Sequence, residues 1–161
     1  MRVRIETPAR LHFGFLDLSG ETGRLYEGVG VALDRPRAVV EAEPAEEVDT
    51  DAGAYFEELL RDAVDVLDVP GARLDVHDRL PRHVGFGSGT QHASAVLEAV
   101  GRANDVETTR SHVRAMGRGV RSGVGRAVFE NGGFVVDAGH PVDVDRKDRR
   151  VPPVAVRHAV P

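Results

Sequence analysis

A glycine-rich stretch between an extended segment and a helical one constrains this chain more than any other feature of its 161 residues. The stretch reads Pro81-Arg82-His83-Val84-Gly85-Phe86-Gly87-Ser88-Gly89-Thr90-Gln91. Glycine lacks a Cβ atom, so its backbone reaches dihedral angles closed to other residues and its N–H groups can approach an anion closely. The helix that follows begins near Ser88–Thr90, and a helix N-terminus attracts negative charge. The stretch therefore predicts a loop that cradles a phosphate group.

Three familiar glycine motifs do not match these letters. A Walker A loop needs a Gly-Lys-Ser/Thr sequence, and the stretch contains no lysine. A dinucleotide-binding fingerprint needs its third glycine one residue after Gly89. A hydrolase nucleophile elbow needs glycines two residues on either side of Ser88, where Phe86 and Thr90 stand. A tight connection with no ligand is the alternative that the letters alone leave open.

Hydrophobic periodicity predicts an α+β fold, because strands come first and helices with returning strands follow. Helices are expected over 54–67, from about residue 88, and over 109–117. Extended segments are expected over 2–17, 25–33, 37–43, 74–77 and 132–137, with a turn at 19–23 and a loop at 44–47. The tail from Val151 to Val156 reads as the start of a further strand, which suggests a truncated chain.

Composition limits the classes of protein to consider. The chain is 41% hydrophobic, enough for one compact domain, and its net charge of −5 argues against general nucleic-acid binding. No apolar run is long enough to span a membrane, and the N-terminus is charged where a signal peptide is apolar, so a soluble cytoplasmic protein is expected. There is no cysteine, and the histidines lack metal-ligand spacing, so no zinc site is expected.

Three segments together resemble motifs of the GHMP superfamily of small-molecule kinases and their relatives. The glycine stretch at 81–91 is similar to the second superfamily motif, and Thr7–Phe15 is similar to the first. Ser122-Gly123-Val124-Gly125, followed by Gly132-Gly133, resembles the Ser-Gly-x-Asp…Gly-Gly segment. The resemblance implies a ribosomal protein S5 domain 2-like N-terminal domain, in which a mixed sheet packs against helices.

Within the superfamily the chain most resembles the β-ribofuranosylaminobenzene 5'-phosphate synthase family. The likeness rests on Ala9–His12, Asp17–Gly20, Gly23-Arg24 with Gly28–Leu33, Gly85–Gln91 and Gly117–Gly123. It covers essentially the whole chain but only about the first half of a full-length member. Residues 1–161 are therefore expected to form the N-terminal phosphate-binding domain, without the C-terminal domain.

A kinase is the weaker reading of the same resemblance. The kinases place an aspartate after Ser-Gly-x to handle the proton of the attacking hydroxyl, and Gly125 stands there in this chain. No carboxylate follows until Glu130. A positioned base contributes roughly a hundred- to ten-thousandfold in rate. An ATP-dependent kinase and a catalytically inactive phosphate-binding fragment remain as alternatives.

The resemblance implies a reaction that needs no such base. Phosphoribosyl pyrophosphate would lose pyrophosphate, and the ring carbon of 4-aminobenzoate, or a related aromatic acid, that bears the carboxylate would attack the ribosyl cation. Carbon dioxide would then leave, in a step of methanopterin-type cofactor synthesis. The protein must stabilise the leaving group and the cation and exclude water. The cofactor expected is Mg²⁺ with the diphosphate, without ATP, and half a cleft suggests a homodimer.

The expected site residues fall into three groups. Asp17 and Arg24 are the catalytic candidates: Asp17 for the ribosyl cation or Mg²⁺–pyrophosphate, Arg24 for a phosphate or the benzoate carboxylate. A turn cap and a solvated arginine explain the same two residues equally well on local grounds. The phosphate-binding candidates are Gly85, Gly87, Ser88, Gly89, Thr90 and Gln91, although Gln91 can equally be a plain first-turn helix residue. The candidate substrate contacts are Arg10, His12, Arg121 and Ser122, with a hydrogen-bonded core histidine as the favoured account of His12.

Overall fold

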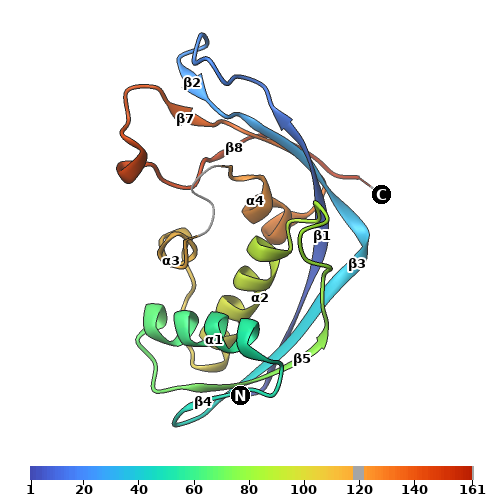
Figure 1. Ribbon diagram of the computed structural model, residues 1–161, viewed down its shortest axis with the longest axis vertical. Helices are drawn as coiled ribbons and strands as arrows, with labels where there is room; N and C mark the ends of the chain where they lie inside the picture. The colour runs from blue at the N-terminus through green and yellow to red at the C-terminus, as the bar shows by residue number, and fades with distance from the viewer. Residues whose placement is uncertain (118–121, 161) are drawn as a thin grey trace.

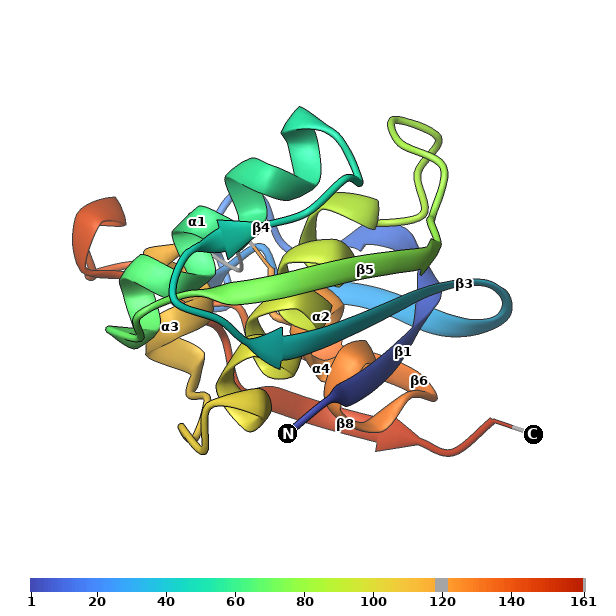
Figure 2. The same ribbon diagram turned by 90° about the horizontal axis from the view of Figure 1, so that it is seen from below.

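The computed structural model describes residues 1–117 and 122–160, which form two layers. A curved sheet makes one layer, and the helices cover its inner face (Figures 1 and 2). The helices are α1 (Ala54–Leu67), α2 (Ser88–Ala103), α3 (Arg110–Ala115) and α4 (Val124–Asn131), with a 3-10 turn η1 at Arg146–Asp148. The strands are β1 (Val3–Phe15), β2 (Arg24–Leu25), β3 (Gly28–Pro44), β4 (Val48–Asp49), β5 (Ala72–Asp78), β6 (Phe134–Asp137), β7 (His140–Pro141) and β8 (Val154–His158).

The long strand β3 organises the sheet. One edge of β3 pairs antiparallel with β1 along almost the whole length of both strands. Its other edge is shared by two strands, β5 against residues 39–44 and β6 against residues 29–31. The short strand β4 runs parallel to β5, and β8 pairs antiparallel with β6, so the sheet is mixed. Strands β2 and β7 form a separate two-stranded ribbon.

The main hydrophobic core lies between α1, α2 and the β5 end of the sheet. Alternation along β1 turns Ile5, Thr7 and Ala9 toward the helices, as expected for a strand with one covered face. Phe56 and Leu60 of α1 and Leu97 of α2 are almost fully buried between the layers. Burying each such side chain contributes roughly 1.5–3 kcal/mol, so this region is the most strongly held part of the fold.

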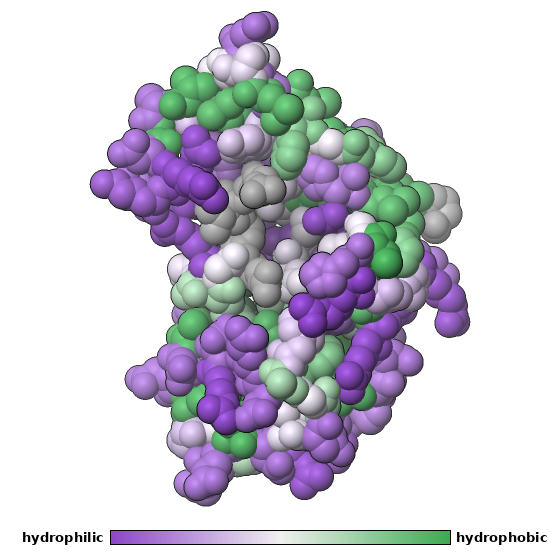
Figure 3. Space-filling model, in the orientation of Figure 1, coloured by the Kyte–Doolittle hydropathy of each residue, from purple (hydrophilic) through white to green (hydrophobic). Residues whose placement is uncertain are grey.

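The opposite end of the molecule, around β2 and β7, has a more apolar surface. Figure 3 shows hydrophobic residues gathered at this end. Leu16, Leu18 and Val142 are 65%, 67% and 50% exposed there. A smaller core of Val124, Ala127, Val128 and Val135 joins α4 to β6 beneath it.

The expected α+β fold is confirmed, and most of its elements lie where the sequence predicted them. The helix at 54–67 has the predicted bounds, and α2 begins at Ser88. The segments 25–33 and 37–43 were predicted as separate strands, but β3 joins them, with residues 33–36 bulging out of register against β1. Helix α4 was not predicted. In the described part of the chain no helix is long and apolar enough to cross a membrane.

Candidate phosphate-binding site

The side chain of Arg10 lies directly against the glycine loop. The backbone N–H of Arg10 donates to the carbonyl of Phe86 at 3.1 Å, which ties β1 to the loop. A Cβ atom on Gly87 would lie 2.8 Å from Nε of Arg10, so only glycine lets the loop pass this close. With φ of 68°, Gly87 also has the left-handed conformation that favours glycine.

No described residue pairs with the Arg10 guanidinium, and its Nε is buried without a hydrogen-bond partner. Burial lowers the pKa of Arg10 below its usual value. A cation removed from water without a counter-charge costs free energy, and a bound anion would offset that cost. The structure therefore leaves a positive charge uncompensated beside the loop that the sequence predicted to bind phosphate.

The first turn of α2, which follows directly after Gly87, carries further donors without a partner among the described residues. No side chain caps this helix, and the amides of Thr90 and Gln91 turn back to the carbonyl of Gly87. The amides of Ser88 and Gly89 have no acceptor among the described residues. The hydroxyl groups of Ser88 and Thr90 likewise make no hydrogen bond there. Together with the helix dipole, these groups can bind an anion.

Helix α4 begins beside α2, but a carboxylate of the chain itself satisfies its N-terminus. Asp137, at the end of β6, is fully buried. Its Oδ2 accepts from the amides of Gly123 and Val124 at 2.7 and 3.2 Å, and its Oδ1 accepts from those of Gly28 and Gly139 at 3.0 and 2.9 Å. Asp137 thus holds together the starts of β3 and α4 and the end of β6.

His12 and Ser122 extend this buried cluster toward β1. The hydroxyl of Ser122 donates to Oδ2 of Asp137 at 2.6 Å, and Nε2 of His12 lies 3.3 Å from the same hydroxyl oxygen. A Cβ atom on Gly28 would lie 2.4 Å from Oγ of Ser122 and 2.7 Å from Oδ2 of Asp137. Residue 28 must therefore be glycine for the cluster to form.

The starts of the two helices are in contact. A Cβ atom on Gly125 would lie 3.0 Å from Cγ2 of Thr90, so α4 packs against the first turn of α2 with almost no space between them. By the sequence resemblance Gly125 stands at the position of the kinases' aspartate, and a side chain there would require Thr90 to shift by a few tenths of an ångström. The carboxylate of Glu130, one helix turn and more away, pairs with Arg110 and Arg126.

Gln91 was predicted as a phosphate contact, and its side chain is fully buried elsewhere. Its Oε1 accepts from the hydroxyl of Thr7 at 2.5 Å, and its Nε2 donates to the carbonyl of Gly125 at 2.8 Å. These bonds join β1, α2 and α4. The side-chain amide of Gln91 is therefore a structural bridge between these three elements.

Asp17 and Arg24, the predicted catalytic pair, are engaged by their own turns. The Asp17 carboxylate accepts five hydrogen bonds, from the amide and hydroxyl groups of Ser19 and Thr22 and the amide of Gly20. The amide donors of Thr22 and Gly20 are the main reason its pKa lies far below the usual range. Arg24 donates to the carbonyls of Ala138 and Gly139 and so ties β2 to the turn before β7.

The hydrogen bonds of Asp17 also affect whether it can bind the expected Mg²⁺. Five donors occupy both oxygens of Asp17, so the residues around it do not fit ligation of a metal in this arrangement. No group of three or more acidic or histidine side chains that could hold a metal occurs in the part of the chain that the structure describes.

Sequence reasoning missed Asp137 and Gly28, and Arg121 cannot be placed. Both missed residues lie at strand ends. Asp137 ends a predicted buried strand, and Gly28 begins a run in which glycine alternates with valine. An acidic residue that ends a buried strand was the available signal. Arg121 lies outside the described residues, so its predicted contact stays a prediction.

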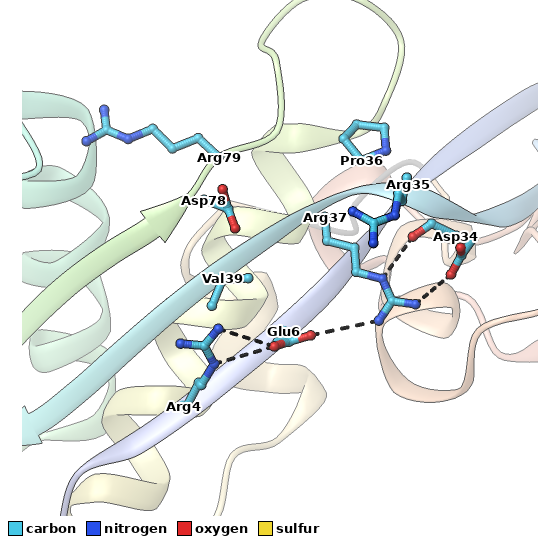
Figure 4. Close-up of a pocket in the computed structure, with 9 residues that line it drawn as sticks. All are labelled: Arg4, Glu6, Asp34, Arg35, Pro36, Arg37, Val39, Asp78 and Arg79. Carbon is cyan, nitrogen blue, oxygen red and sulfur yellow. Dashed lines mark hydrogen bonds and ion pairs between the residues drawn. The ribbon is translucent and has the colours of Figure 1, made fainter.

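A separate, charged pocket of about 680 Å³ lies on the outer face of the sheet (Figure 4). Arg4 and Arg37 line it, and both pair there with Glu6. Arg35 on its rim makes no ion pair with any described residue. Acidic side chains pair with two of its four arginines, Arg4 and Arg37, whereas no acidic side chain of the described residues pairs with Arg10.

Comparison with known proteins defines the class. Residues 52–133 match the GHMP kinases N terminal domain. Among solved structures the fold is similar to Methanococcus jannaschii mevalonate kinase (TM-score 0.57, 14% identity, 84% of this chain and 53% of that chain). It is also similar to 4-(cytidine 5'-diphospho)-2C-methyl-D-erythritol kinase (TM-score 0.60, 18% identity, 86% of this chain and 53% of that chain). At these identities the likeness establishes the fold.

Sequence relatives narrow the class further. The β-ribofuranosylphenol 5'-phosphate synthase of Methanothermobacter thermautotrophicus is 37% identical over 150 residues, covering 84% of this chain and 46% of the relative. The protein of the same name from Archaeoglobus fulgidus is 38% identical over 142 residues, covering 86% of this chain and 45% of the relative. The chain belongs to this family within the GHMP superfamily, and it spans about half the length of these relatives.

Proposed function

We propose that this chain forms the phosphate-binding half of an enzyme that joins phosphoribosyl pyrophosphate to an aromatic acid and releases pyrophosphate and carbon dioxide. The names of the relatives support a ribosyl phenol phosphate as the product. The acceptor proposed for this chain is therefore 4-hydroxybenzoate, in place of the 4-aminobenzoate expected from the sequence. The pathway expected is methanopterin-type cofactor synthesis.

The observation that carries this proposal is the unpaired guanidinium of Arg10 beside the uncapped start of α2. Leaving of pyrophosphate places negative charge on its oxygens, and donors already fixed in place stabilise that charge without reorganising. Arg10, the free amides of Ser88 and Gly89 and the hydroxyl of Thr90 supply such donors. Their common target is a phosphate or diphosphate group.

The packing at Gly125 favours ribosyl transfer over a kinase reaction. A kinase of this superfamily needs a group to handle the proton of the attacking hydroxyl, and the kinase position is filled here by a glycine pressed against Thr90. An aromatic ring that attacks through carbon does not need a base at that position. The close approach of α4 to α2 therefore supports the transferase.

Calorimetry tests the proposal on the chain itself. We expect phosphoribosyl pyrophosphate and pyrophosphate to bind more tightly than ATP. Arg10→Met should weaken pyrophosphate binding by about 10- to 100-fold, because a hydrogen bond to a charged group contributes roughly 1.5–3 kcal/mol.

Arg35→Met is the matched control, since it removes an unpaired arginine from the opposite face of the sheet and should leave the affinity unchanged. Tighter binding of ATP, or equal pyrophosphate affinity in the Arg10 variant and the parent chain, would contradict the proposal.

A further inference from the structure

The hydrogen bonds around Ser122 determine which nitrogen of His12 carries the proton. A hydroxyl group has one hydrogen, and Ser122 lies 2.6 Å from Oδ2 of Asp137, whose four other partners are all backbone N–H donors. The hydrogen of Ser122 is therefore donated to Asp137. Nε2 of His12 must then donate to Oγ of Ser122, and in a neutral imidazole the other nitrogen, Nδ1, is an acceptor.

Nδ1 of His12 makes no hydrogen bond to any described residue, and the ring is only partly buried. His12 and Arg10 are two residues apart on β1, so their side chains leave the same face of the strand about 7 Å apart. Arg10 contacts Gly87 at the start of α2, and His12 contacts Ser122, two residues before α4 begins. An acceptor atom without a partner among the described residues thus lies near the proposed diphosphate site.

We propose that Nδ1 of His12 accepts the hydroxyl hydrogen of a phenolic substrate, with Ser122 and Asp137 as positioning residues. This inference rests on the proposed function, because the relatives' names specify a phenol product. The O–H bond breaks, its proton moves to Nδ1 and its electron pair enters the ring. The opposite ring carbon then bonds to C1 of the ribose as the bond from C1 to pyrophosphate breaks.

The remaining steps restore the aromatic ring and the neutral form of His12. The carboxylate on the attacked carbon leaves as carbon dioxide, and its bonding electrons return to the ring. The proton on Nδ1 returns to the phenolic oxygen, so no oxidant or further reactant is consumed. The imidazolium formed in between is stabilised through Ser122 by the buried carboxylate of Asp137.

The electrostatic surroundings of His12 suit an acceptor. Burial of the ring lowers the pKa of His12, the charge of Arg10 lowers it further, and the carboxylate of Asp137 acts in the opposite direction. These are the charged groups that act on the ring among the described residues. His12 is therefore neutral at neutral pH, and Nδ1 is free to accept a hydrogen bond.

Two substitutions separate the Nδ1 acceptor of His12 from the hydrogen bond between Nε2 and Ser122. Glutamine places its amide nitrogen near the position of Nε2, so His12→Gln keeps the bond to Ser122 and removes the Nδ1 acceptor. Asparagine places its amide near Nδ1, so His12→Asn keeps an acceptor there and loses the bond to Ser122. The quantity measured is the ratio of benzoate Kd to 4-hydroxybenzoate Kd, by calorimetry with pyrophosphate saturating.

The parent chain should prefer 4-hydroxybenzoate by about tenfold, as expected for one hydrogen bond. His12→Gln should abolish this preference, while His12→Asn and Ser122→Ala should keep part of it. Lowering the pH should remove the preference in the parent chain, because a protonated Nδ1 cannot accept. Nitrogen-15 NMR of the free chain should show the Nε2–H tautomer.

An Nδ1–H tautomer, no binding of 4-hydroxybenzoate, or an unchanged preference in His12→Gln would overturn the inference. If pyrophosphate still binds in an Arg10-dependent manner in that case, only the role of His12 fails and the proposed function stands. Loss of the Arg10-dependent binding would instead reject the proposed function itself.

Discussion

The first turns of α2 and α4 lie against each other, yet their amides are satisfied in different ways. At α4 a buried carboxylate, Asp137, accepts from the first amides of the helix. At α2 no described side chain caps the helix, and the charge next to it is the cation of Arg10, which pairs with none of the described residues. One helix start therefore contains its own anion, and the other is arranged for an anion from outside.

This difference indicates where a diphosphate would bind. A second negative charge at α4 would meet the carboxylate of Asp137 and be repelled, whereas at α2 it would meet a cation and free amides. The two helix starts also have different roles: the start of α4 stabilises the fold, and the start of α2 has donors available for a ligand. Three measurements test whether the two helix starts differ in this way.

The largest effect is expected from Asp137→Asn. An amide nitrogen in place of one carboxylate oxygen would face N–H and O–H donors in a fully buried position, for example those of Ser122 and Gly123. We expect the free energy of unfolding to fall by about 3–5 kcal/mol, measured by urea denaturation. The exposed Asp143→Asn is the control and should change it by less than about 0.5 kcal/mol. An equally small loss of unfolding free energy in Asp137→Asn would show that Asp137 does not stabilise the fold at the start of α4.

An intermediate effect is expected from pH, through His92 in the second turn of α2. His92 accepts a hydrogen bond from the amide of Leu80 at 3.0 Å. Burial, with smaller effects from Arg82 and Arg79, lowers the pKa of His92 from 6.5 to about 4. The unfolded chain binds this proton first, so stability is complete above pH 6.5 and should fall by about 1.4 kcal/mol per pH unit toward pH 4.

Urea denaturation at pH 7, 6 and 5 checks this expectation. His12 contributes in the same direction, because its pKa is lowered as well. His92→Gln keeps an acceptor for Leu80 but does not titrate, so its stability should depend less on pH. An equal slope in the variant and the parent chain would assign the pH dependence to other groups.

The smallest effect, and the most direct contrast with Asp137, is expected for the stability of Arg10→Met. Removing an uncompensated and partly buried cation relieves a desolvation cost while the alkyl part of the side chain is kept. The free energy of unfolding should stay within about 1 kcal/mol of the parent value or rise. A loss as large as that of Asp137→Asn would mean that Arg10 supports the fold, and the comparison of the two helix starts would fail.

Local sequence patterns predicted a large part of this architecture. Six apolar residues at helical spacing defined α1 with its observed bounds, and the glycine loop marked the start of α2 at Ser88. They did not predict α4, since an eight-residue helix that begins Val-Gly and follows a glycine has weak intrinsic propensity. Its first amides depend on Asp137, which is 13 residues further along the chain than Val124.

The elements that could be predicted from the sequence are those with a local cause: amphipathic spacing, alternation along strands, and glycines where the backbone must turn. Which polar groups already have partners depends on how distant parts of the chain fold together. Asp17, Arg24 and Gln91 were candidates in the sequence and are hydrogen-bonded to their neighbours, while Arg10 has no partner in the part of the chain that the structure describes. The free energy of a charge depends on the donors and acceptors around it, and these come from segments far apart in the sequence.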